Sequence, residues 1–406
     1  MSLIKVCVIT SSRSEYGLIR WLMDDLKSSD DFELKVIATG SHFSEKYGLT
    51  YQEIESNGFT IDKKIPFNLD KSDQTSVAKA TGLLTGDLVD ALDILNPDIV
   101  MVMGDRYELL SVLTACILKT IPIAHISGGE ITEGAIDDQI RHAMTKASHL
   151  HYVANEVYGA RIVQMGEEQW RVCVSGEPGL DNLYRQPLMS FDELQNDLGM
   201  NLLKPTALVT FHPVTLELED LDWQVKELLM ALNQATEEQE LQYLITFPNA
   251  DPSSINIIKT LEEFTYKRSD RKLVKSLGQA RYLSALKYLS MMIGNSSSGL
   301  TEAPSFSLPV INIGNRQQGR MKGQNVFDVG YTHTEINEGI KHALSWDRTV
   351  SCYNPYGNGN SSLKILEHLR HVFSNYNPKQ LISKQFINIK EVTEVERRIQ
   401  NRYDKL

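Results

Sequence analysis

The stretch Ile293-Gly294-Asn295-Ser296-Ser297-Ser298-Gly299-Leu300-Thr301-Glu302 decides how the second half of the chain folds. The apolar run that leads into it, residues 288–293, is expected to form a buried strand, and a short helix is expected to follow. Small hydroxyl side chains beside a glycine let backbone N–H groups face outward at a helix start, which suits a phosphate group. A helix cap without a ligand is the alternative interpretation.

Charged neighbours favour the phosphate interpretation. Glu302 is expected one turn into the helix, and Arg316, Arg320 and Lys322 follow the next strand with no acidic residue among them. The stretch lacks the Gly-Lys-Ser/Thr of an ATPase loop, and no G-x-G-x-x-G marks a dinucleotide site. We therefore expect a phosphate-bearing ligand of another kind.

The composition bounds the class of protein. With 406 residues and 42% hydrophobic content, the chain has room for two domains. Its formal net charge of -11 argues against a nucleic-acid partner, because binding to a duplex needs an extended basic surface. An anionic ligand would then depend on local positive groups.

The cysteines, histidines and N-terminus indicate a cytoplasmic protein without a metal. The four cysteines are far apart and form no C-x-x-C pair, so neither a disulfide framework nor a zinc site is indicated. His142, His149 and His151 lack the two-histidine i, i+4 spacing with a carboxylate that a helical zinc site shows. The N-terminus has no basic-then-apolar leader and no apolar stretch is long enough to span a bilayer, so no membrane partner is expected.

Short β-branched runs alternate with longer amphipathic segments along the chain. Strands are expected at residues 4–10, 34–39, 99–103, 121–126, 151–154 and 171–174, and in a second series at 207–211 and 241–247. The helices of the second series are expected at residues 222–235 and 253–266. This alternation predicts an α/β fold with two Rossmann-like domains, each a parallel sheet covered on both faces, that face a central cleft.

A turn-rich segment at residues 175–179 separates the two series. We expect the first domain at residues 1–178 and the second at 179–362. The remaining residues, 363–406, are expected to complete a helix that starts near residue 361 and to end in a charged tail.

Chemistry-bearing side chains directly follow several of the predicted strands. Arg13, His42, Asp105 and Glu130 lie in loops after first-domain strands, and His212 has the same position in the second domain. Ligands of parallel sheets bind outside the carboxyl ends of the strands, so these side chains can converge although they are far apart in sequence. Two glycines precede Glu130 and allow close backbone approach to a ligand, and partial desolvation there would suit an acid or a base.

Six short motifs follow one another in order between residues 5 and 322. The first four are TSSRSEYG at residues 10–17, GDR at 104–106, HISGGE at 125–130 and DDQIRH at 137–142. The other two are FHP at residues 211–213 and the C-terminal set GNSSSG, Glu302 and GNRQQGR within residues 294–320. Together they resemble the hydrolysing UDP-N-acetylglucosamine 2-epimerases of sialic-acid biosynthesis, whose plan is that of the GT-B-like proteins.

The resemblance implies a substrate and a set of site residues. It implies a UDP-linked amino sugar, UDP-N-acetylglucosamine, as the binding partner, a homodimer, and no cofactor or metal. It assigns acid and base chemistry on the sugar to Asp105, Glu130 and Asp138, the last preferred over Asp137 for its spacing before Arg141 and His142. The predicted ligands of the nucleotide and diphosphate are Arg13, His42, Arg106, His212, Asn249, Ser296, Ser297, Glu302, Arg316 and Arg320. In the family's architecture the helix at 361–373 crosses back to the first domain.

The implied reaction eliminates UDP with loss of the proton at sugar carbon 2 and then adds water, giving N-acetylmannosamine through a 2-acetamidoglucal. Close alternatives are the same reaction on a UDP- or GDP-linked 2,4-diacetamido-2,4,6-trideoxyhexose, and a non-hydrolysing epimerase whose product stays on UDP. A glycosyltransferase with the same two-domain plan and a nucleotide-sugar sensor without activity belong to other classes.

Overall fold

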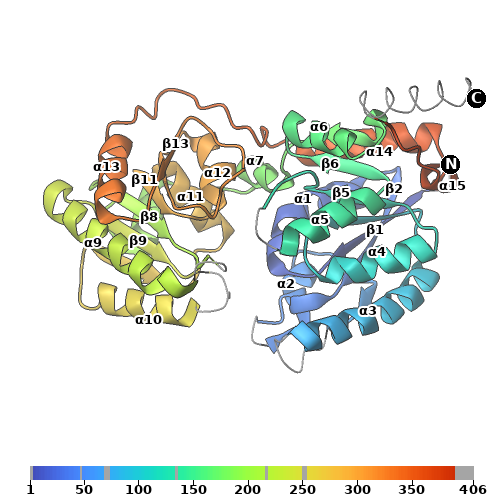
Figure 1. Cartoon of the computed structure of the whole chain (residues 1–406), viewed down its shortest axis with the longest axis horizontal. Coiled ribbons are helices and arrows are strands. Elements are labelled where there is room, and N and C mark those ends of the chain that lie inside the picture. Colours follow the sequence, from blue (N-terminus) through green and yellow to red (C-terminus); the bar gives the residue numbers. More distant parts are fainter. Residues whose placement is uncertain are drawn as a thin grey trace, which may run out of the picture. The chain divides into compact units, whose positions relative to one another are not determined.

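The computed structural model describes residues 3–45, 48–67, 74–132, 136–214, 218–248 and 254–388. The chain forms two compact units (Figure 1). The first unit takes in Met1–Ile131, Ala135–Asn182 and Tyr356–Leu406, and the second takes in Leu183–Pro355 with Thr132–Gly134. The first unit is therefore built from both ends of the chain.

The first unit contains a seven-stranded parallel sheet in the order β3-β2-β1-β4-β5-β6-β7. Its strands are β1 (Ile4–Thr10), β2 (Phe32–Ala38), β3 (Lys63–Lys64), β4 (Ile99–Met103), β5 (Ile123–Ile126), β6 (Leu150–Val153) and β7 (Val172–Val174). The strand order reverses between β1 and β4, and such a reversal opens a crevice at the carboxyl ends of the strands. The side of a sheet at which the carboxyl ends of its strands lie is called here its carboxyl edge.

Helices cover both faces of this sheet. They are α1 (Arg13–Ser28), α2 (Tyr51–Ser56), α3 (Gln74–Leu95), α4 (Glu108–Leu118), α5 (Ile136–Ala147), α6 (Glu156–Gln164), α14 (Ser361–Asn375) and α15 (Pro378–Ile382), while α7 (Asn182–Arg185) lies at the boundary of the unit. One apolar core joins α1 and α14 to the sheet, for example through Tyr16, Leu26 and Leu369. The other joins α3, α4 and α5 to the opposite face through Leu88, Val112 and their neighbours.

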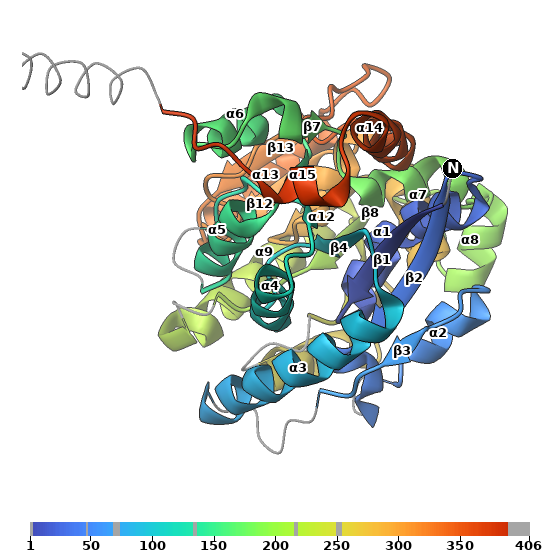
Figure 2. The same ribbon diagram turned by 90° about the vertical axis from the view of Figure 1, so that its right-hand side faces the viewer.

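The returning C-terminal helix α14 is fixed to the first unit by polar and apolar contacts. The carboxylate of Asp181 accepts the backbone N–H groups of Ser361 and Ser362, both at 2.8 Å, and so caps the helix start. Farther along, α14 packs against α1 and also touches β7 (Figure 2). The predicted helix at residues 361–373 thus packs on the first unit.

The second unit contains a six-stranded parallel sheet in the order β10-β9-β8-β11-β12-β13. Its strands are β8 (Thr206–Thr210), β9 (Gln242–Thr246), β10 (Arg271–Val274), β11 (Met291–Gly294), β12 (Val310–Ile313) and β13 (Val326–Val329). Its helices are α8 (Phe191–Leu198), α9 (Leu221–Gln239), α10 (Ser254–Thr265), α11 (Gln279–Tyr288), α12 (Ser298–Thr301) and α13 (His333–Leu344). Two apolar cores, one under α9, α10 and α13 and one under α8 and α11, fill its two faces.

The predicted fold class, α/β with two domains each built on a parallel sheet, is confirmed. Most predicted strands begin and end within two residues of the observed ones. The prediction for residues 288–293 was wrong at its start, because the Leu289 N–H still donates to the Ala285 carbonyl at 2.8 Å and closes α11, so the strand begins at Met291. The predicted charged tail from Lys390 lies outside the described residues.

Candidate active site

Three loops at the carboxyl edge of the second sheet are joined through Asn295, a fully buried residue directly after β11. Its side-chain oxygen accepts the His212 N–H at 2.7 Å, and its side-chain amide donates to the His212 carbonyl at 2.9 Å. Its own carbonyl accepts hydrogen bonds from Arg316 at 3.0 Å and from Gln317 at 2.9 Å. The loops after β8, β11 and β12 are therefore held together, and two predicted ligands, His212 and Arg316, meet there.

The turn into this loop requires glycine at position 294. Gly294 has a φ of +138°, and a Cβ atom there would lie 1.9 Å from the carbonyl oxygen of Thr210 in β8. Because the two strands approach so closely, the residues that follow Gly294 leave the sheet beside the end of β8.

The loop with Ser296 and Ser297 enters a helix of a single turn, α12, which ends at Thr301 with Glu302 as its C-cap; a 3-10 turn that contains Pro304 follows. Both serines are half-buried. The Thr301 hydroxyl donates to the Glu302 carboxylate at 3.0 Å. Burial raises the pKa of Glu302, and hydrogen bonds from the Ser298 and Thr301 hydroxyls partly oppose this rise.

Tyr282 on α11 also belongs to this cluster and was not predicted from the sequence. Its hydroxyl donates to the Ser298 hydroxyl at 2.5 Å, and it lies close enough to Glu302 for their charges to interact. Tyr282 stands 16 residues before Ser298 inside an ordinary amphipathic helix, so no local pattern marked it.

The state of the basic groups at this edge follows from their surroundings. Burial, together with the positive charge of Arg316, lowers the pKa of His212 to about 3, so its imidazole is neutral at physiological pH. Lys322 pairs with Asp328 of β13 at 2.7 Å. Arg316 and Arg320 are both half-buried. Asn249, the remaining predicted ligand from this unit, lies outside the described residues.

At the carboxyl edge of the first sheet, the loop after β1 is closed by Glu15. Its carboxylate accepts the N–H of Ser11 at 2.8 Å and of Ser12 at 3.2 Å, which forms a capping box at the start of α1. Burial raises the pKa of Glu15 to about 7, although the nearby Arg106 opposes the rise. Arg106 itself makes two hydrogen bonds to the buried Glu108, at 2.8 and 3.2 Å, and lies 3.9 Å from Glu15.

The pKa of Glu15 predicts a pH dependence of folding stability. Because the pKa in the folded protein, about 7, lies above the ordinary value of 4.5, the native state binds this proton more tightly than the unfolded state. The stability that this proton contributes is fully present below pH 4.5 and is lost as the pH rises to 7. In urea unfolding at several pH values, we expect Glu15→Gln to gain stability relative to the original chain across this window. Parallel curves for the two proteins would contradict the assignment.

Arg13 and His42 occupy different environments in the first unit. The exposed Arg13 pairs with Glu53 of α2 at 2.9 Å, a surface contact of small energy. His42 is fully buried, and its two ring nitrogens lie 3.1 Å from the Thr10 hydroxyl and 2.8 Å from the Thr50 hydroxyl. Burial lowers the pKa of His42 to about 4. These contacts fix the loop after β2, and a direct role of His42 in binding stays a prediction.

Two of the predicted acid/base residues meet on one buried guanidinium. Asp105, in the loop after β4, forms an ion pair with Arg141 of α5. The Asp138 carboxylate lies 3.8 Å from another nitrogen of Arg141 and 3.4 Å from His142. Asp137, the residue not chosen, is exposed. The structure therefore brings Asp105 and Asp138 together on Arg141, whose contact with them was not predicted from the sequence.

Glu130 is drawn into the interior by the two glycines before it. A Cβ atom at Gly129, whose φ is +75°, would lie 2.4 Å from the Tyr158 carbonyl, and one at Gly128 would lie 2.9 Å from the Thr145 hydroxyl. Without these Cβ atoms, the loop packs directly on α5 and α6. Glu130 is only 6% exposed as a result, in the partly desolvated setting that the sequence predicted for it.

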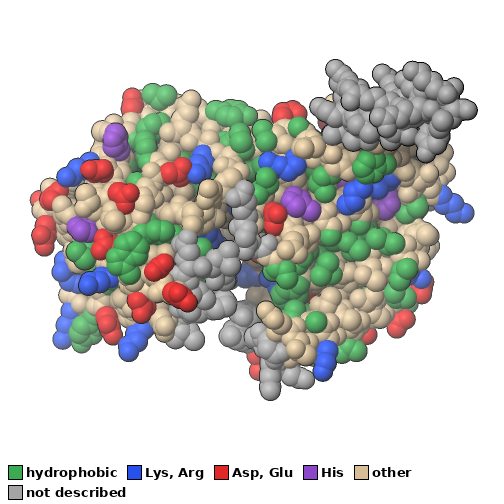
Figure 3. All heavy atoms as spheres, in the orientation of Figure 1, with side chains coloured by type: hydrophobic (Ala, Val, Ile, Leu, Met, Phe, Trp, Pro, Cys, Tyr) green, Lys and Arg blue, Asp and Glu red, His purple; other side chains and the backbone are tan. Residues whose placement is uncertain are grey.

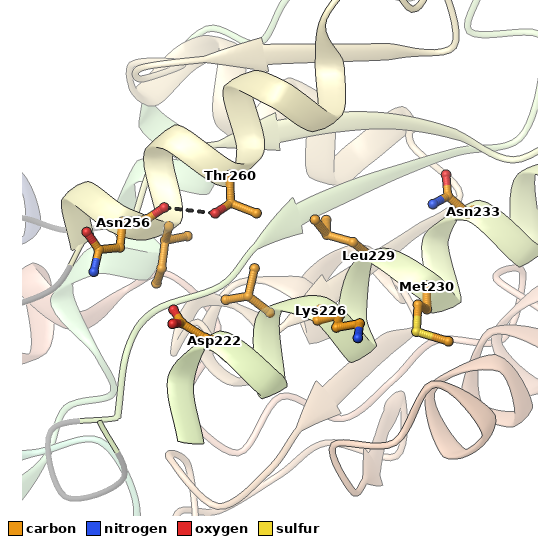
Figure 4. A pocket seen from close by; sticks show the side chains of 9 residues that line it. Asp222, Lys226, Leu229, Met230, Asn233, Asn256 and Thr260 are labelled. Atoms are coloured by element: carbon orange, nitrogen blue, oxygen red, sulfur yellow. Dashed lines mark hydrogen bonds between the residues drawn. The ribbon is translucent and has the colours of Figure 1, made fainter. Parts of the chain in front are cut away.

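The second unit also contains a pocket of about 370 Å³ between α9 and α10 (Figure 4). Its polar lining groups include Asp222, Lys226 and Asn233 from α9 and Thr260 from α10. None of the predicted site residues lines it. Across the described ranges, no three histidine, cysteine, aspartate or glutamate side chains form a group that could hold a metal ion.

Comparison with known proteins assigns the family. Residues 24–370 match the family described as UDP-N-acetylglucosamine 2-epimerase. The chain belongs to this family. The resemblance that the six motifs indicated is thereby confirmed. The matched residues include strands of both parallel sheets.

Relatives of this chain in the UDP-N-acetylglucosamine 2-epimerase family are named for different sugars or pathways. "GDP/UDP-N,N'-diacetylbacillosamine 2-epimerase (hydrolyzing)" of Campylobacter jejuni is 41% identical over 83% of this chain and 86% of its own length. "Polysialic acid biosynthesis protein P7" of Escherichia coli is 34% identical over 96% of this chain and 98% of its own length. The crystal structure of UDP-GlcNAc 2-epimerase from Neisseria meningitidis bound to UDP-GlcNAc has a TM-score of 0.76 at 19% identity, covers 91% of this chain and 100% of its own, and shows the shared fold.

No helix in the part of the chain that the structure describes is long and apolar enough to cross a membrane.

Proposed function

We propose that this protein is a hydrolysing nucleotide-sugar 2-epimerase that acts on a UDP- or GDP-linked 2,4-diacetamido-2,4,6-trideoxyhexose. The observation that carries the proposal is the 41% identity, over most of both chains, to an enzyme named for a hydrolysing reaction on such a sugar. The UDP-N-acetylglucosamine substrate expected from the sequence motifs is the second candidate, which the 34% identical polysialic acid protein favours.

The chemistry needs two proton transfers on one sugar carbon. Carbon 2 bears an acetamido group and has no adjacent carbonyl, so departure of the nucleoside diphosphate must help to break its C–H bond. A carboxylate removes the proton, a glycal forms, and water then adds while a proton returns to carbon 2 on the other face. The first unit supplies three carboxylates for these steps: Asp105 and Asp138 on Arg141, and Glu130 in the loop beside α5.

The leaving diphosphate needs positive charge and hydrogen-bond donors. We assign the nucleotide to the carboxyl edge of the second unit. There, Arg316 and His212 both contact Asn295, which directly precedes the loop with Ser296 and Ser297. Arg320 and the undescribed Asn249 complete this set on sequence grounds. From the first unit, Arg13, Arg106 and the loop fixed by His42 are assigned to the diphosphate.

Glu302 is assigned to the two ribose hydroxyls, because a carboxylate can accept both of them. Glu302→Ala should weaken the binding of UDP by roughly 1–3 kcal/mol, the cost of losing a charged hydrogen-bond partner. Titration calorimetry with UDP measures this directly. Glu335→Ala, which removes an exposed capping carboxylate on α13, is the matched control and should leave the affinity unchanged. Unchanged affinity in Glu302→Ala would remove Glu302 from the ribose site.

Incubation with the UDP-linked diacetamido sugar alone tests the proposed function. We expect free sugar and free UDP in equal amounts, with no second substrate. A product still attached to UDP would select the non-hydrolysing epimerase, and turnover that requires an acceptor sugar would select the glycosyltransferase. Failure of every nucleotide sugar, with UDP still bound, would select the sensor.

We also propose that the protein forms the homodimer expected from the resemblance. Hydrophobic side chains gather on the surface over α4 and beside it (Figure 3). The exposed large hydrophobic side chains of these helices include Leu83 of α3 and Leu110, Ile117 and Leu118 of α4, with Leu118 75% exposed. Light scattering of the purified protein tests the proposal, and a monomer at micromolar concentration would contradict it.

A further inference from the structure

Arg141 is almost completely buried, at 3% exposure, yet it carries a permanent charge. Its guanidinium forms an ion pair with Asp105 through one terminal nitrogen and lies 3.8 Å from Asp138 through the other. A buried charge is tolerated only where partners compensate it. Both partners here are carboxylates that the proposed reaction needs, and they come from different elements of the first unit.

Side-chain contacts connect the helix that carries Arg141 to the turn that carries Asp105. Asp138, Arg141 and Thr145 are spaced i, i+3 and i+7, so they lie on one face of α5. The Thr145 hydroxyl lies 3.4 Å from one ring nitrogen of the buried His125, and the other ring nitrogen lies 2.8 Å from the Gly104 carbonyl. The same face of α5 is thereby connected to the turn that presents Asp105.

We propose that Arg141 is a positioning residue of the epimerase site, which holds Asp105 and Asp138 in a fixed relation through the two ends of its guanidinium. The inference rests on the proposed function, because it assigns a role to Arg141 only through these carboxylates. With both carboxylates ionised, the three groups carry one net negative charge. When one carboxylate takes the proton from carbon 2, the set becomes neutral, and it regains its charge when the proton leaves.

Lysine cannot replace Arg141 in this role, since its ammonium is a single point charge and lacks the planar fork that reaches two acceptors at once. We expect Arg141→Lys to lower kcat by about 100-fold, as small misplacements of catalytic groups do. The affinity for UDP should not change, because the nucleotide is assigned to other residues. Arg141→Gln, whose side chain is shorter and uncharged, should lower kcat at least as much.

A matched control separates positioning from general damage to the fold. Arg171 is another buried arginine of the first unit, at 1% exposure, and it pairs with Glu168 at 2.6 Å away from the predicted site residues. Arg171→Lys should reduce thermal stability to a degree comparable to Arg141→Lys and leave kcat of the folded protein unchanged. Far-ultraviolet circular dichroism and thermal melts establish that the variants compared are folded.

The decisive readout is a double-mutant cycle for kcat between Arg141→Lys and Asp105→Asn, measured by release of UDP over long incubations. If Arg141 acts through Asp105 and Asp138, the loss of kcat in the double variant should fall well short of the product of the two single losses. Losses that multiply, normal turnover in Arg141→Lys, or an equal loss of kcat in Arg171→Lys would each overturn the inference. An unmutated protein that turns over no nucleotide sugar would instead show that the proposed function itself has failed.

Discussion

Changing Asp105 or Asp138 to asparagine, or Glu130 to glutamine, should lower kcat by about 100- to 10,000-fold, the range for loss of an acid or base. Each amide keeps the shape of the side chain but cannot take up or deliver a proton at carbon 2. The affinity for UDP should stay unchanged, since no nucleotide contact is removed. Steady-state release of UDP and calorimetry with UDP together measure both quantities.

Asp137→Asn provides the matched control for this series. Asp137 precedes Asp138 on the same helix and is exposed, so its change should leave kcat unaltered. If Asp137→Asn lost activity and Asp138→Asn kept it, the choice between the two neighbours would be reversed. Normal turnover in all three amide variants would require the acid/base set to be abandoned.

The second large effect concerns the sugar. We expect kcat/KM for the UDP-linked diacetamido-trideoxyhexose to exceed that for UDP-N-acetylglucosamine by about 100- to 10,000-fold. A site that hydrogen-bonds the 4-acetamido group leaves buried polar groups unpaired when the group is absent, and a pocket shaped for the methyl at carbon 6 gains less from a hydroxymethyl group.

Both substrates can be compared in the same assay, with UDP release as the signal and the free sugar identified by mass spectrometry. The GDP-linked form of the diacetamido sugar should be included, because the 41% identical relative is named for both nucleotides. A preference for UDP-N-acetylglucosamine would instead support the N-acetylmannosamine product that the motifs implied.

The two sheets were predictable because their central strands are short apolar runs at regular spacing. Ile99–Met103 and Ile4–Thr10 were identified to the residue. The strands for which no range was predicted include the edge strands β3 (Lys63–Lys64) and β10 (Arg271–Val274), each of which carries charged residues and is paired on one side only. An edge strand needs less apolar character than a central one, so the periodicity there is weak.

The candidate site was partly predictable for a topological reason. In a parallel sheet, polar residues just after the strands meet at one edge, which is how Asp105 and Glu130 were found. The supporting residues were not found, because their roles depend on contacts across long stretches of chain: 83 residues separate Asn295 from His212, and 36 separate Arg141 from Asp105. A short sequence window contains no trace of such contacts.

In the proposed reaction a proton leaves carbon 2 as the diphosphate departs, and a new proton from solvent reaches carbon 2 when water adds to the glycal. Turnover of the UDP-linked diacetamido sugar in heavy water tests it most directly, with mass spectrometry and NMR of the product. We expect one deuterium at carbon 2 of the free, epimerised sugar and one UDP for each sugar released. Retention of the original hydrogen at carbon 2 would contradict it.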